Sequence, residues 1–351
     1  MDIGVVVCVK RLGLIVRSDF GAGLANQSWE MYRNLEPDAT LVVLMGARGR
    51  GPESPQRYDP AYVVHYLQND AQAIATMEEF LSKIDVLLSV ETFYEPFVVT
   101  RAFELGVERV LYANAELLNR EDPAEHADRY LWPASWGQPF PEPGEILPWP
   151  CSTDVEPRQE INWPPRFVHV GAPAFHDRNG SGLILDAAMA TAEHCEIVCY
   201  GTVPPSDGLP TTPLTYRDAV ADHWDLYRDA DCLVLPRRYG CLSLPMLEAA
   251  AMGVPTLTTD LDPQRGWFSK WAPWLLIPPG QCKMESMKGS LMHLGKSGVA
   301  VYDPDPADLA RAMDRLAARD DVLDALRVEV REWAETRSWD VLKPAWEAAL
   351  R

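Results

Sequence analysis

Residues 235–255 read LPRRYGCLSLPMLEAAAMGVP, and this stretch decides the fold class. It follows the apolar run Asp231–Leu235, which predicts a buried strand, and its small-residue loop leads into a helix expected to begin near Pro245. Gly253 is expected to end that helix, and Pro255 to open the next strand. A strand, a short helix and a second strand form the repeating unit of a parallel α/β sheet.

The same alternation of short apolar strands and helices runs along both halves of the chain, which predicts an α/β fold. The first half is expected to hold the strands Leu12–Arg17, Thr40–Met45, Tyr62–Tyr66, Asp85–Val90 and Glu108–Ala113, and the helices Asn26–Leu35, Asp70–Leu81 and Pro96–Leu105. The second half is expected to hold the strands Arg166–Val170, Glu196–Tyr200, Asp231–Leu235 and Thr256–Thr258, the helices Gly182–Glu193 and Pro245–Met252, and a helical tail from Pro306. Ile3–Val9 is either a separate strand or an extension of the first.

A proline-rich stretch separates the two halves. Residues 138–165 read QPFPEPGEILPWPCSTDVEPRQEINWPP, and proline removes hydrogen-bond donors and stiffens the backbone, so we expect a linker there rather than the interior of a sheet. The predicted organisation is a Rossmann-like domain over 1–150, a linker over 151–165, a second Rossmann-like domain over 166–335, and a last helix over 336–351 that crosses back to the first domain. Two such domains leave a cleft between them, where α/β proteins bind ligands.

The composition excludes several classes of function. A net charge of −19 repels nucleic acids and anionic lipid, so DNA-binding, RNA-binding and membrane-surface roles are disfavoured. No apolar run approaches the roughly 20 residues that span a bilayer, and we find no signal-peptide pattern. The 7 cysteines are scattered, and no second pair completes a zinc site with Cys195 and Cys199. We therefore expect a cytoplasmic protein with buried thiols and no transmembrane segment.

Glu248 is the most informative candidate for ligand binding. It is expected in the first turn of the helix at 245–252, where the helix dipole supports a carboxylate. A carboxylate in that place can accept two hydrogen bonds from the hydroxyls of a ribose, or it can be an ordinary helix-capping glutamate.

Residues 169–180, HVGAPAFHDRNG, combine a strand end, a loop and a helix start. Arg178 lies just before the helix, so its guanidinium and the backbone N–H groups of the helix N-terminus can together hold a diphosphate. Gly171 and Asn179 belong to the same predicted site. His169 is either a catalytic group or a core histidine.

Two further segments in the first half are candidates for the ligand cleft. Residues 19–26, DFGAGLAN, nearly match the dinucleotide fingerprint, but Asn26 replaces its third glycine and no acidic residue ends the next strand, so an NAD-dependent dehydrogenase is disfavoured. Gly23 is expected to line the cleft or to serve only the turn. Glu91 follows the strand Asp85–Val90, where it can orient or deprotonate an acceptor hydroxyl, and Asn114 and Glu116 share that edge.

The pattern LPxLEAxAxGxP at 244–255 resembles the C-terminal signature of GT-B nucleotide-sugar glycosyltransferases, especially the large retaining group numbered family four. HVGAP…DRNG resembles that family's glycine-then-basic diphosphate segment, and the glycine loop at 19–26 and LPWP at 147–150 extend the resemblance over most of the chain. The resemblance implies a GT-B fold and transfer with retention. It also implies that Glu248 binds the donor ribose, Arg178 the diphosphate, and the backbone around Ser243 and Leu244 the phosphates.

Two positions depart from the family pattern. The family usually carries a second glutamate eight positions before the ribose-binding one, where this chain has Gly240, so the transferred sugar is not implied. The usual lysine after the arginine is also missing, with Asn179 in the nearest place, so Arg237 or Arg238 is expected to help hold the phosphates.

The expected function is therefore transfer of a sugar from a UDP- or GDP-sugar, which is a substrate and not a resident cofactor. The sequence leaves the acceptor open among proteins, glycans, lipids and small molecules. Metal independence is expected, because Asp303-Pro304-Asp305 is typical of a turn and a helix N-cap rather than a metal pair. Two alternatives stay open: a GT-B nucleotide-sugar epimerase, and a non-catalytic sugar- or nucleotide-binding protein on the same fold, which Gly240 favours.

Overall fold

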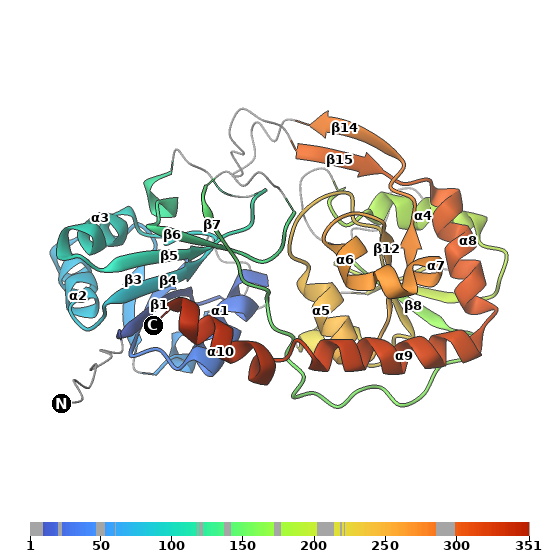
Figure 1. The fold of residues 1–351 in the computed structure, drawn as a ribbon, viewed down its shortest axis with the longest axis horizontal. Helices are drawn as coiled ribbons and strands as arrows, with labels where there is room; N and C mark the ends of the chain where they lie inside the picture. The colour runs from blue at the N-terminus through green and yellow to red at the C-terminus, as the bar shows by residue number, and fades with distance from the viewer. Residues whose placement is uncertain are drawn as a thin grey trace, which may run out of the picture. The chain divides into compact units, whose positions relative to one another are not determined.

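A computed structural model describes residues 10–19, 23–46, 53–59, 61–116, 118, 122–136, 142–171, 177–201, 214–217, 220, 222–285 and 299–350 (Figure 1). The chain divides into two compact units, of which unit 1 comprises Met1–Pro133, Phe140–Pro148 and Leu342–Arg351, and unit 2 comprises Ala134–Pro139 and Trp149–Val341. The possible strand Ile3–Val9 lies outside the described residues. Within those residues, none of the helices combines the length and apolar character that crossing a bilayer requires.

Unit 1 contains a parallel sheet with the strand order β3-β2-β1-β4-β5-β6-β7. Its elements are β1 (Leu12–Arg17), α1 (Gly23–Leu35), β2 (Ala39–Leu44), the 3-10 turn η2 (Pro55–Arg57), β3 (Ala61–His65), α2 (Ala71–Leu81), β4 (Val86–Val90), α3 (Pro96–Leu105), β5 (Glu108–Tyr112), η3 (Pro123–Glu125), β6 (Arg129–Trp132) and β7 (Gly144–Ile146). Helix α1 packs on β1 and β4, α2 on β2 and β3, and α3 on β5.

The sequence signals at the ends of α2 and α3 explain these helices. The Asp70 carboxylate accepts hydrogen bonds from the N–H groups of Gln72 and Ala73, so it caps α2. Helix α3 spans Pro96–Leu105, the predicted bounds, and Gly106 ends it in the left-handed region with φ 72°. The sequence did not predict β7, which lies in the proline-rich stretch. Among the described residues this strand pairs with β6 alone, at the edge of the sheet, where a flanking proline removes no ladder hydrogen bond. It therefore agrees with the expectation that this stretch does not form the interior of a sheet.

Unit 2 contains a second parallel sheet, with the order β10-β9-β8-β11-β12-β13. Its elements are β8 (Arg166–Val170), α4 (Ser181–Ala190), β9 (Glu196–Tyr200), β10 (Leu214–Arg217), η5 (His223–Leu226), β11 (Cys232–Leu235), α5 (Leu244–Ala251), β12 (Thr256–Thr259), α6 (Gln264–Phe268), η6 (Ser269–Trp271), α7 (Ala272–Leu275) and β13 (Leu276–Ile277). A separate antiparallel hairpin joins β14 (Gln281–Glu285) to β15 (Val299–Asp303). The sequence did not predict β10 or β13, because both are short strands at the sheet edges.

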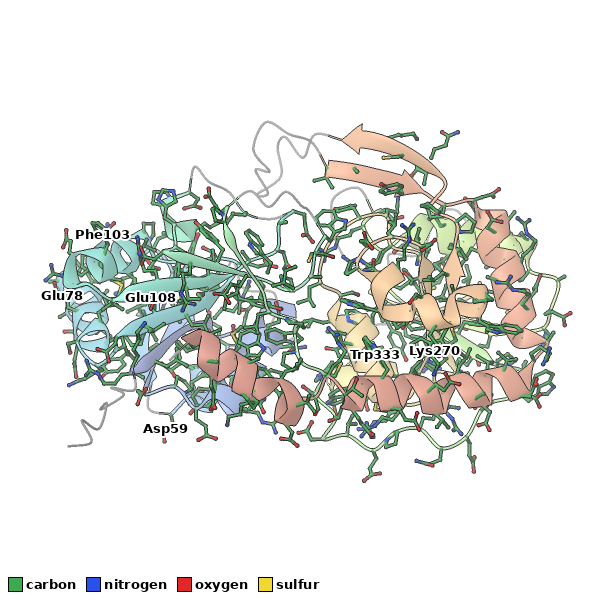
Figure 2. All side chains as sticks on the ribbon, in the orientation of Figure 1. Asp59, Glu78, Phe103, Glu108, Lys270 and Trp333 are labelled. Carbon is green, nitrogen blue, oxygen red and sulfur yellow. The ribbon has the colours of Figure 1, made fainter. Side chains whose placement is uncertain are left out.

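The tail forms the helices α8 (Pro306–Ala317), α9 (Asp320–Glu335) and α10 (Trp339–Leu350). Helix α8 contacts α4, and α9 runs alongside α5 (Figure 1). Lys270 and Trp333 lie where η6 and α6 pack on α9 (Figure 2). Lys270 Nζ is 2.7 Å from the Glu329 carboxylate, and the ring centroids of Trp333 and Phe268 are 5.7 Å apart. The predicted fold class, two parallel α/β sheets with packed C-terminal helices, is confirmed.

Both sheets reverse their strand order at one point. In unit 1 the chain builds outward from β1 to β3 and then returns to β4, and in unit 2 it builds from β8 to β10 and returns to β11. Ligands of such sheets bind beyond the carboxyl ends of the two strands at the reversal. Glu108, the first residue of β5, marks the opposite, amino ends of the strands in unit 1 (Figure 2).

Candidate functional site

The loops that follow β8 and β11 are held together at the reversal point of unit 2. The backbone N–H of Arg238 donates to the carbonyl oxygen of Arg178 at 2.9 Å. Gly180 has φ 73°, and a Cβ there would lie 2.5 Å from the carbonyl oxygen of Pro236, so only glycine permits this approach. Two segments that are far apart in the sequence therefore meet at one edge of the sheet, as the predicted site requires.

Glu248 lies on α5, directly after the β11 loop. Its side chain is 15% exposed, and its Oε2 accepts a hydrogen bond from the Tyr227 hydroxyl at 2.8 Å. His223 Nε2 lies 4.0 Å from Oε1. Because α5 begins at Leu244, Glu248 falls beyond its first turn, where the dipole has little effect. The expectation that the helix dipole stabilises the Glu248 carboxylate is therefore corrected. The hydrogen bond from the Tyr227 hydroxyl stabilises it instead.

The N-terminus of α5 is suited to binding an anion. Ser243 is the N-cap residue, but its side chain makes no capping hydrogen bond, and its Oγ is buried without a hydrogen-bond partner among the described residues. Helix N-termini leave backbone N–H groups unbonded and carry a partial positive charge. Ser243 and Leu244 therefore offer donors at the end of β11, close to Glu248 in sequence.

The N-terminus of α4, in contrast, is already occupied by a carboxylate. Asp177 accepts hydrogen bonds from the N–H groups of Ser181 at 2.7 Å and Gly182 at 2.9 Å. The expectation that these N–H groups hold a diphosphate beside Arg178 is therefore corrected. Asn179 is buried and donates through Nδ2 to the Val170 carbonyl oxygen at 3.0 Å, so it fixes the end of β8.

Gly171 and Gly23 stay predictions as ligand-binding residues. Gly171 follows β8, and its N–H donates to the Tyr200 carbonyl oxygen at 2.8 Å. The stretch 172–176 after it lies outside the described residues. Gly23 is the first residue of α1, and the glycine loop before it is likewise not described at 20–22.

The side chains of Arg237 and Arg238 bind protein groups. Arg237 is buried and donates to the carbonyl oxygens of Leu242 at 3.1 Å and Tyr239 at 3.2 Å, which shapes the loop before α5. The Arg238 guanidinium forms an ion pair with the Asp303 carboxylate at the end of β15. In the structure the donors of these arginines serve the loop and the hairpin, and their help in holding phosphates stays a prediction.

His169 is a structural residue of β8. It is fully buried; its Nδ1 lies 2.9 Å from the Val234 carbonyl oxygen and its Nε2 lies 2.8 Å from the Ser181 Oγ. Burial lowers the pKa of His169, which keeps the ring neutral. We therefore replace the catalytic role considered from the sequence with a role in packing.

Gly240 adopts a backbone conformation that disfavours other residues. Its φ is 106°, within the region that L side chains rarely enter. The neighbouring Tyr239 packs against Val299 and Val301 of β15. The loop at this position is therefore built around a glycine conformation, which a glutamate at 240 would adopt only with strain.

At the reversal point of unit 1, charged groups gather at the ends of β1 and β4. Arg17 and Asp19 form a buried ion pair, with Nη2 at 2.8 Å from Oδ2. Burial opposes the charge on Arg17, but Asp19, Tyr94 and Glu91 outweigh it and raise the pKa of Arg17. The Asn114 Nδ2 donates to Glu91 Oε1 at 2.6 Å. Unit 1 thus brings together Glu91 and Asn114, as predicted, and adds an arginine–aspartate pair that the sequence did not single out.

Glu91 sits in a strained turn. It has φ 62° and Tyr94 has φ 63°, although neither is glycine. Such strain is costly and clusters at functional sites. The hydroxyls of Ser18 and Tyr94 and the Asn114 Oδ1 are buried without a hydrogen-bond partner among the described residues. Buried polar atoms of this kind are matched to a polar ligand or to water.

Glu95 makes the stability of unit 1 depend on pH. Burial raises its carboxyl pKa from 4.5 to about 7, against a hydrogen bond from the Leu67 N–H that lowers it. Between pH 4.5 and 7 the folded protein therefore keeps a proton that the unfolded chain has lost. The contribution of Glu95 to the stability of the fold is complete below pH 4.5 and is lost as the pH rises through 7. We expect Glu95→Gln, a neutral isostere, to match the wild type at pH 4 and to exceed its stability by about 2 kcal/mol at pH 8.

Urea unfolding at pH 4 and pH 8 measures this difference, with Glu104→Gln at an exposed position of α3 as the control. Parallel pH profiles for the wild type and Glu95→Gln would contradict the assignment of a raised pKa.

Comparison with known proteins identifies the fold and one domain. Residues 164–285 match the family model of glycosyl transferases group 1. No curated protein sequence matches the chain significantly. Among solved structures, sucrose-phosphate synthase from Thermosynechococcus elongatus has a TM-score of 0.66 at 14% identity, over 97% of this chain and 98% of that one. Anabaena HepE in complex with UDP-glucose has a TM-score of 0.69 at 11% identity, over 97% and 98%.

The lipopolysaccharide outer core galactosyltransferase WaaB has a TM-score of 0.58 at 11% identity, over 97% of this chain and 100% of that one. At these identities the solved structures show the fold alone. The GT-B fold that the sequence resemblance implied is confirmed.

Proposed function

We propose that this chain, which carries a group 1 glycosyl transferase domain on a GT-B fold, transfers a sugar from a nucleoside diphosphate sugar to a hydroxyl acceptor. The observation that carries the proposal is in unit 2. Glu248, the α5 N-terminus and Arg178 all follow the carboxyl ends of β8 and β11, where the N–H of Arg238 bonds the Arg178 carbonyl oxygen at 2.9 Å. A carboxylate can bind the diol of a ribose, and positive groups can bind a diphosphate. These are the two parts of a nucleoside diphosphate that such a site would contact.

In the proposed complex, Glu248 accepts hydrogen bonds from the ribose hydroxyls. The backbone at Ser243 and Leu244 and the Arg178 guanidinium contact the diphosphate. Arg178 is the arginine we assign to the phosphates, because it lies in the loop after β8 that the Arg238 N–H joins to the loop after β11. The donor is a UDP- or GDP-sugar, and UDP-sugars come first for testing because HepE was solved with UDP and with UDP-glucose.

The departing diphosphate gains negative charge as the glycosidic bond breaks. Arg178 and the α5 N-terminus are preorganised donors for that charge, which is the usual source of a large rate enhancement. We propose that no metal ion is required. Asp305 caps α8 through the Ala307 N–H, and Asp303 pairs with Arg238 and Lys283, so both carboxylates have structural partners. Retention of configuration rests on the family resemblance.

Two other Asp-x-Asp sequences need the same consideration. Asp229-Ala230-Asp231 precedes β11, and its carboxylates pair with Arg166 and Arg158. Asp260-Leu261-Asp262 follows the carboxyl end of β12. Asp260 there pairs with Arg265 at 2.8 Å. A comparison of turnover with and without EDTA therefore decides between metal-free and metal-assisted transfer.

The acceptor half of the proposal belongs to unit 1. Glu91, oriented by Asn114 at 2.6 Å, is assigned to bind the acceptor hydroxyl and to take its proton. The buried Ser18, Tyr94 and Asn114 atoms without described partners support a polar, hydroxyl-bearing acceptor.

Glu91→Gln is expected to lower kcat by about 100-fold or more, because the amide cannot take the acceptor's proton. It is also expected to raise the acceptor KM roughly tenfold and to leave donor binding unchanged. The amide keeps one acceptor oxygen but loses the charge, and a hydrogen bond to a charged group is worth about 1.5–3 kcal/mol. Initial rates over a range of acceptor concentrations measure the effect, with Glu78→Gln on α2 as the control (Figure 2). An unchanged acceptor KM would remove Glu91 from the site.

The experiment that tests the function is a donor screen. The protein is incubated with UDP- and GDP-sugars, with and without EDTA, while nucleoside diphosphate release and the melting temperature are followed. A specific donor at 100 times its Kd adds about 2.7 kcal/mol of stability. We expect one nucleotide class to bind and to turn over at the same rate in EDTA.

The screen also separates the alternatives. Loss of turnover in EDTA would refute metal independence. A new donor isomer without acceptor would indicate an epimerase instead. Binding with no turnover in any acceptor mixture would support a non-catalytic protein, which the glycine-specific loop at Gly240 favours, and binding of no nucleotide at all would reject the proposal.

A further inference from the structure

Tyr227 links the core of unit 2 to the carboxylate of Glu248. It follows η5 and precedes β11, and its ring is fully buried among the core residues of the unit. Its hydroxyl reaches out of that core and donates to Glu248 Oε2 at 2.8 Å. The two residues lie 21 positions apart, so only the fold brings them together.

The phenol is a fixed donor. Burial, and then the neighbouring Glu248, raise the pKa of Tyr227 well above its usual value, so the hydroxyl keeps its proton at all ordinary pH values. The backbone of the turn is held as well, because the Tyr227 N–H donates to the Trp224 carbonyl oxygen at 3.0 Å and the Ala230 N–H donates to the Tyr227 carbonyl oxygen at 3.0 Å. A glutamate side chain has several free torsions, and a bond to a rigid donor removes that freedom before any ligand arrives.

We propose that Tyr227 is a positioning residue that sets the preference of this site for a ribose over a sugar ring lacking its hydroxyls. This inference rests on the proposed function, in which Glu248 binds the ribose. A carboxylate has about four lone-pair positions, so one bond from Tyr227 leaves capacity for the two hydroxyls of a ribose. With Oε2 fixed by the phenol, the carboxylate presents one orientation to the diol.

A merely structural bond would have a different signature. If the hydrogen bond only tied the η5 turn to α5, its loss would lower the melting temperature and weaken every nucleotide by the same factor. A positioning bond acts through Glu248, so its loss weakens ligands that carry ribose hydroxyls and spares those that lack them.

The test uses Tyr227→Phe, which removes the hydroxyl and keeps the buried ring. Calorimetry measures the Kd of UDP and of its 2′,3′-dideoxy analogue, or of the guanosine pair if the donor screen selects GDP. We expect the wild type to favour the ribonucleotide about 100-fold. In Tyr227→Phe the Kd of the ribonucleotide rises about tenfold and that of the dideoxy analogue does not, so the preference falls about tenfold.

Two controls complete the experiment. Tyr216→Phe, on the edge strand β10, makes the same chemical change away from Glu248 and should leave the preference intact. In a Glu248→Ala background, adding Tyr227→Phe should change the preference no further, because the group it positions is gone.

The outcomes separate this inference from the function it rests on. If the wild type prefers the ribonucleotide and Tyr227→Phe keeps that preference, the positioning role is wrong and the proposed function is unaffected. A wild type that binds both nucleotides equally overturns the ribose contact of Glu248 and the positioning role together. A folded Tyr227→Phe that weakens both nucleotides alike assigns Tyr227 a structural role.

Discussion

Glu248→Ala is expected to weaken nucleoside diphosphate binding about 100-fold. In the proposed complex the carboxylate accepts two hydrogen bonds from ribose hydroxyls, and each bond to a charged group contributes about 1.5–3 kcal/mol. The lower value for both bonds gives about 3 kcal/mol, or roughly two orders of magnitude in Kd. Calorimetric titration with UDP and GDP, together with kcat/KM for the donor that turns over, measures the loss.

The alanine variant also leaves the Tyr227 hydroxyl buried without its acceptor, which costs about 1–3 kcal/mol of stability. Glu248→Gln is the matched control, because an amide oxygen still accepts from Tyr227 but carries no charge. We expect Glu248→Gln to retain the wild-type melting temperature and to lose about tenfold in affinity. If Glu248→Ala folds and binds nucleotide as tightly as the wild type, Glu248 is not the ribose ligand and the donor site must be placed elsewhere.

Arg178→Ala is expected to lower kcat by about 100- to 1,000-fold. Removing one preorganised donor to a developing negative charge has effects of this size. Arg178 is the arginine to test because it lies in the loop after β8, which a backbone hydrogen bond joins to the loop that leads from β11 to α5. The α5 N-terminus remains in the variant, so donor binding should weaken less than turnover.

Arg178→Lys sharpens the test. Lysine keeps the charge but not the planar, two-pronged donor, so kcat should recover only in part. Arg315→Ala, at an exposed position of α8, removes the same charge from the unit without touching the loops. Equal losses of kcat in Arg178→Ala and Arg315→Ala would show a general effect of charge. If Arg178→Ala keeps the wild-type kcat, Arg178 is not part of the diphosphate site.

The location of the predicted site follows from the strand order. The sequence predicts strands that end before Gly171 and Pro236, but it does not state that these strands are neighbours. The order β9-β8-β11-β12 makes them so, and the bond from the Arg238 N–H to the Arg178 carbonyl oxygen at 2.9 Å joins their loops. Other residues far apart in the sequence become partners in the same way: the Trp271 indole of η6 donates to the Glu329 carboxylate of α9, 58 positions away.

The sequence by itself determined the elements and the residue types that end them. Asp70, Pro96, Gly106 and Asp305 set helix ends through capping and backbone preferences, which are local and act within a few residues. The alternation of apolar runs determined the two parallel sheets, and the pattern LPxLEAxAxGxP placed Glu248 on a short helix after a strand.

Only the tertiary structure decided which charged groups keep their capacity for a ligand. Arg238 is committed to Asp303, Asp177 caps α4, His169 is bonded at both nitrogens, and Tyr227 supports Glu248. The physical reason is that a side chain's chemistry depends on its neighbours in space, whose burial and hydrogen bonds set its charge and its orientation. Those neighbours come from distant parts of the chain, where no local pattern in the sequence records them.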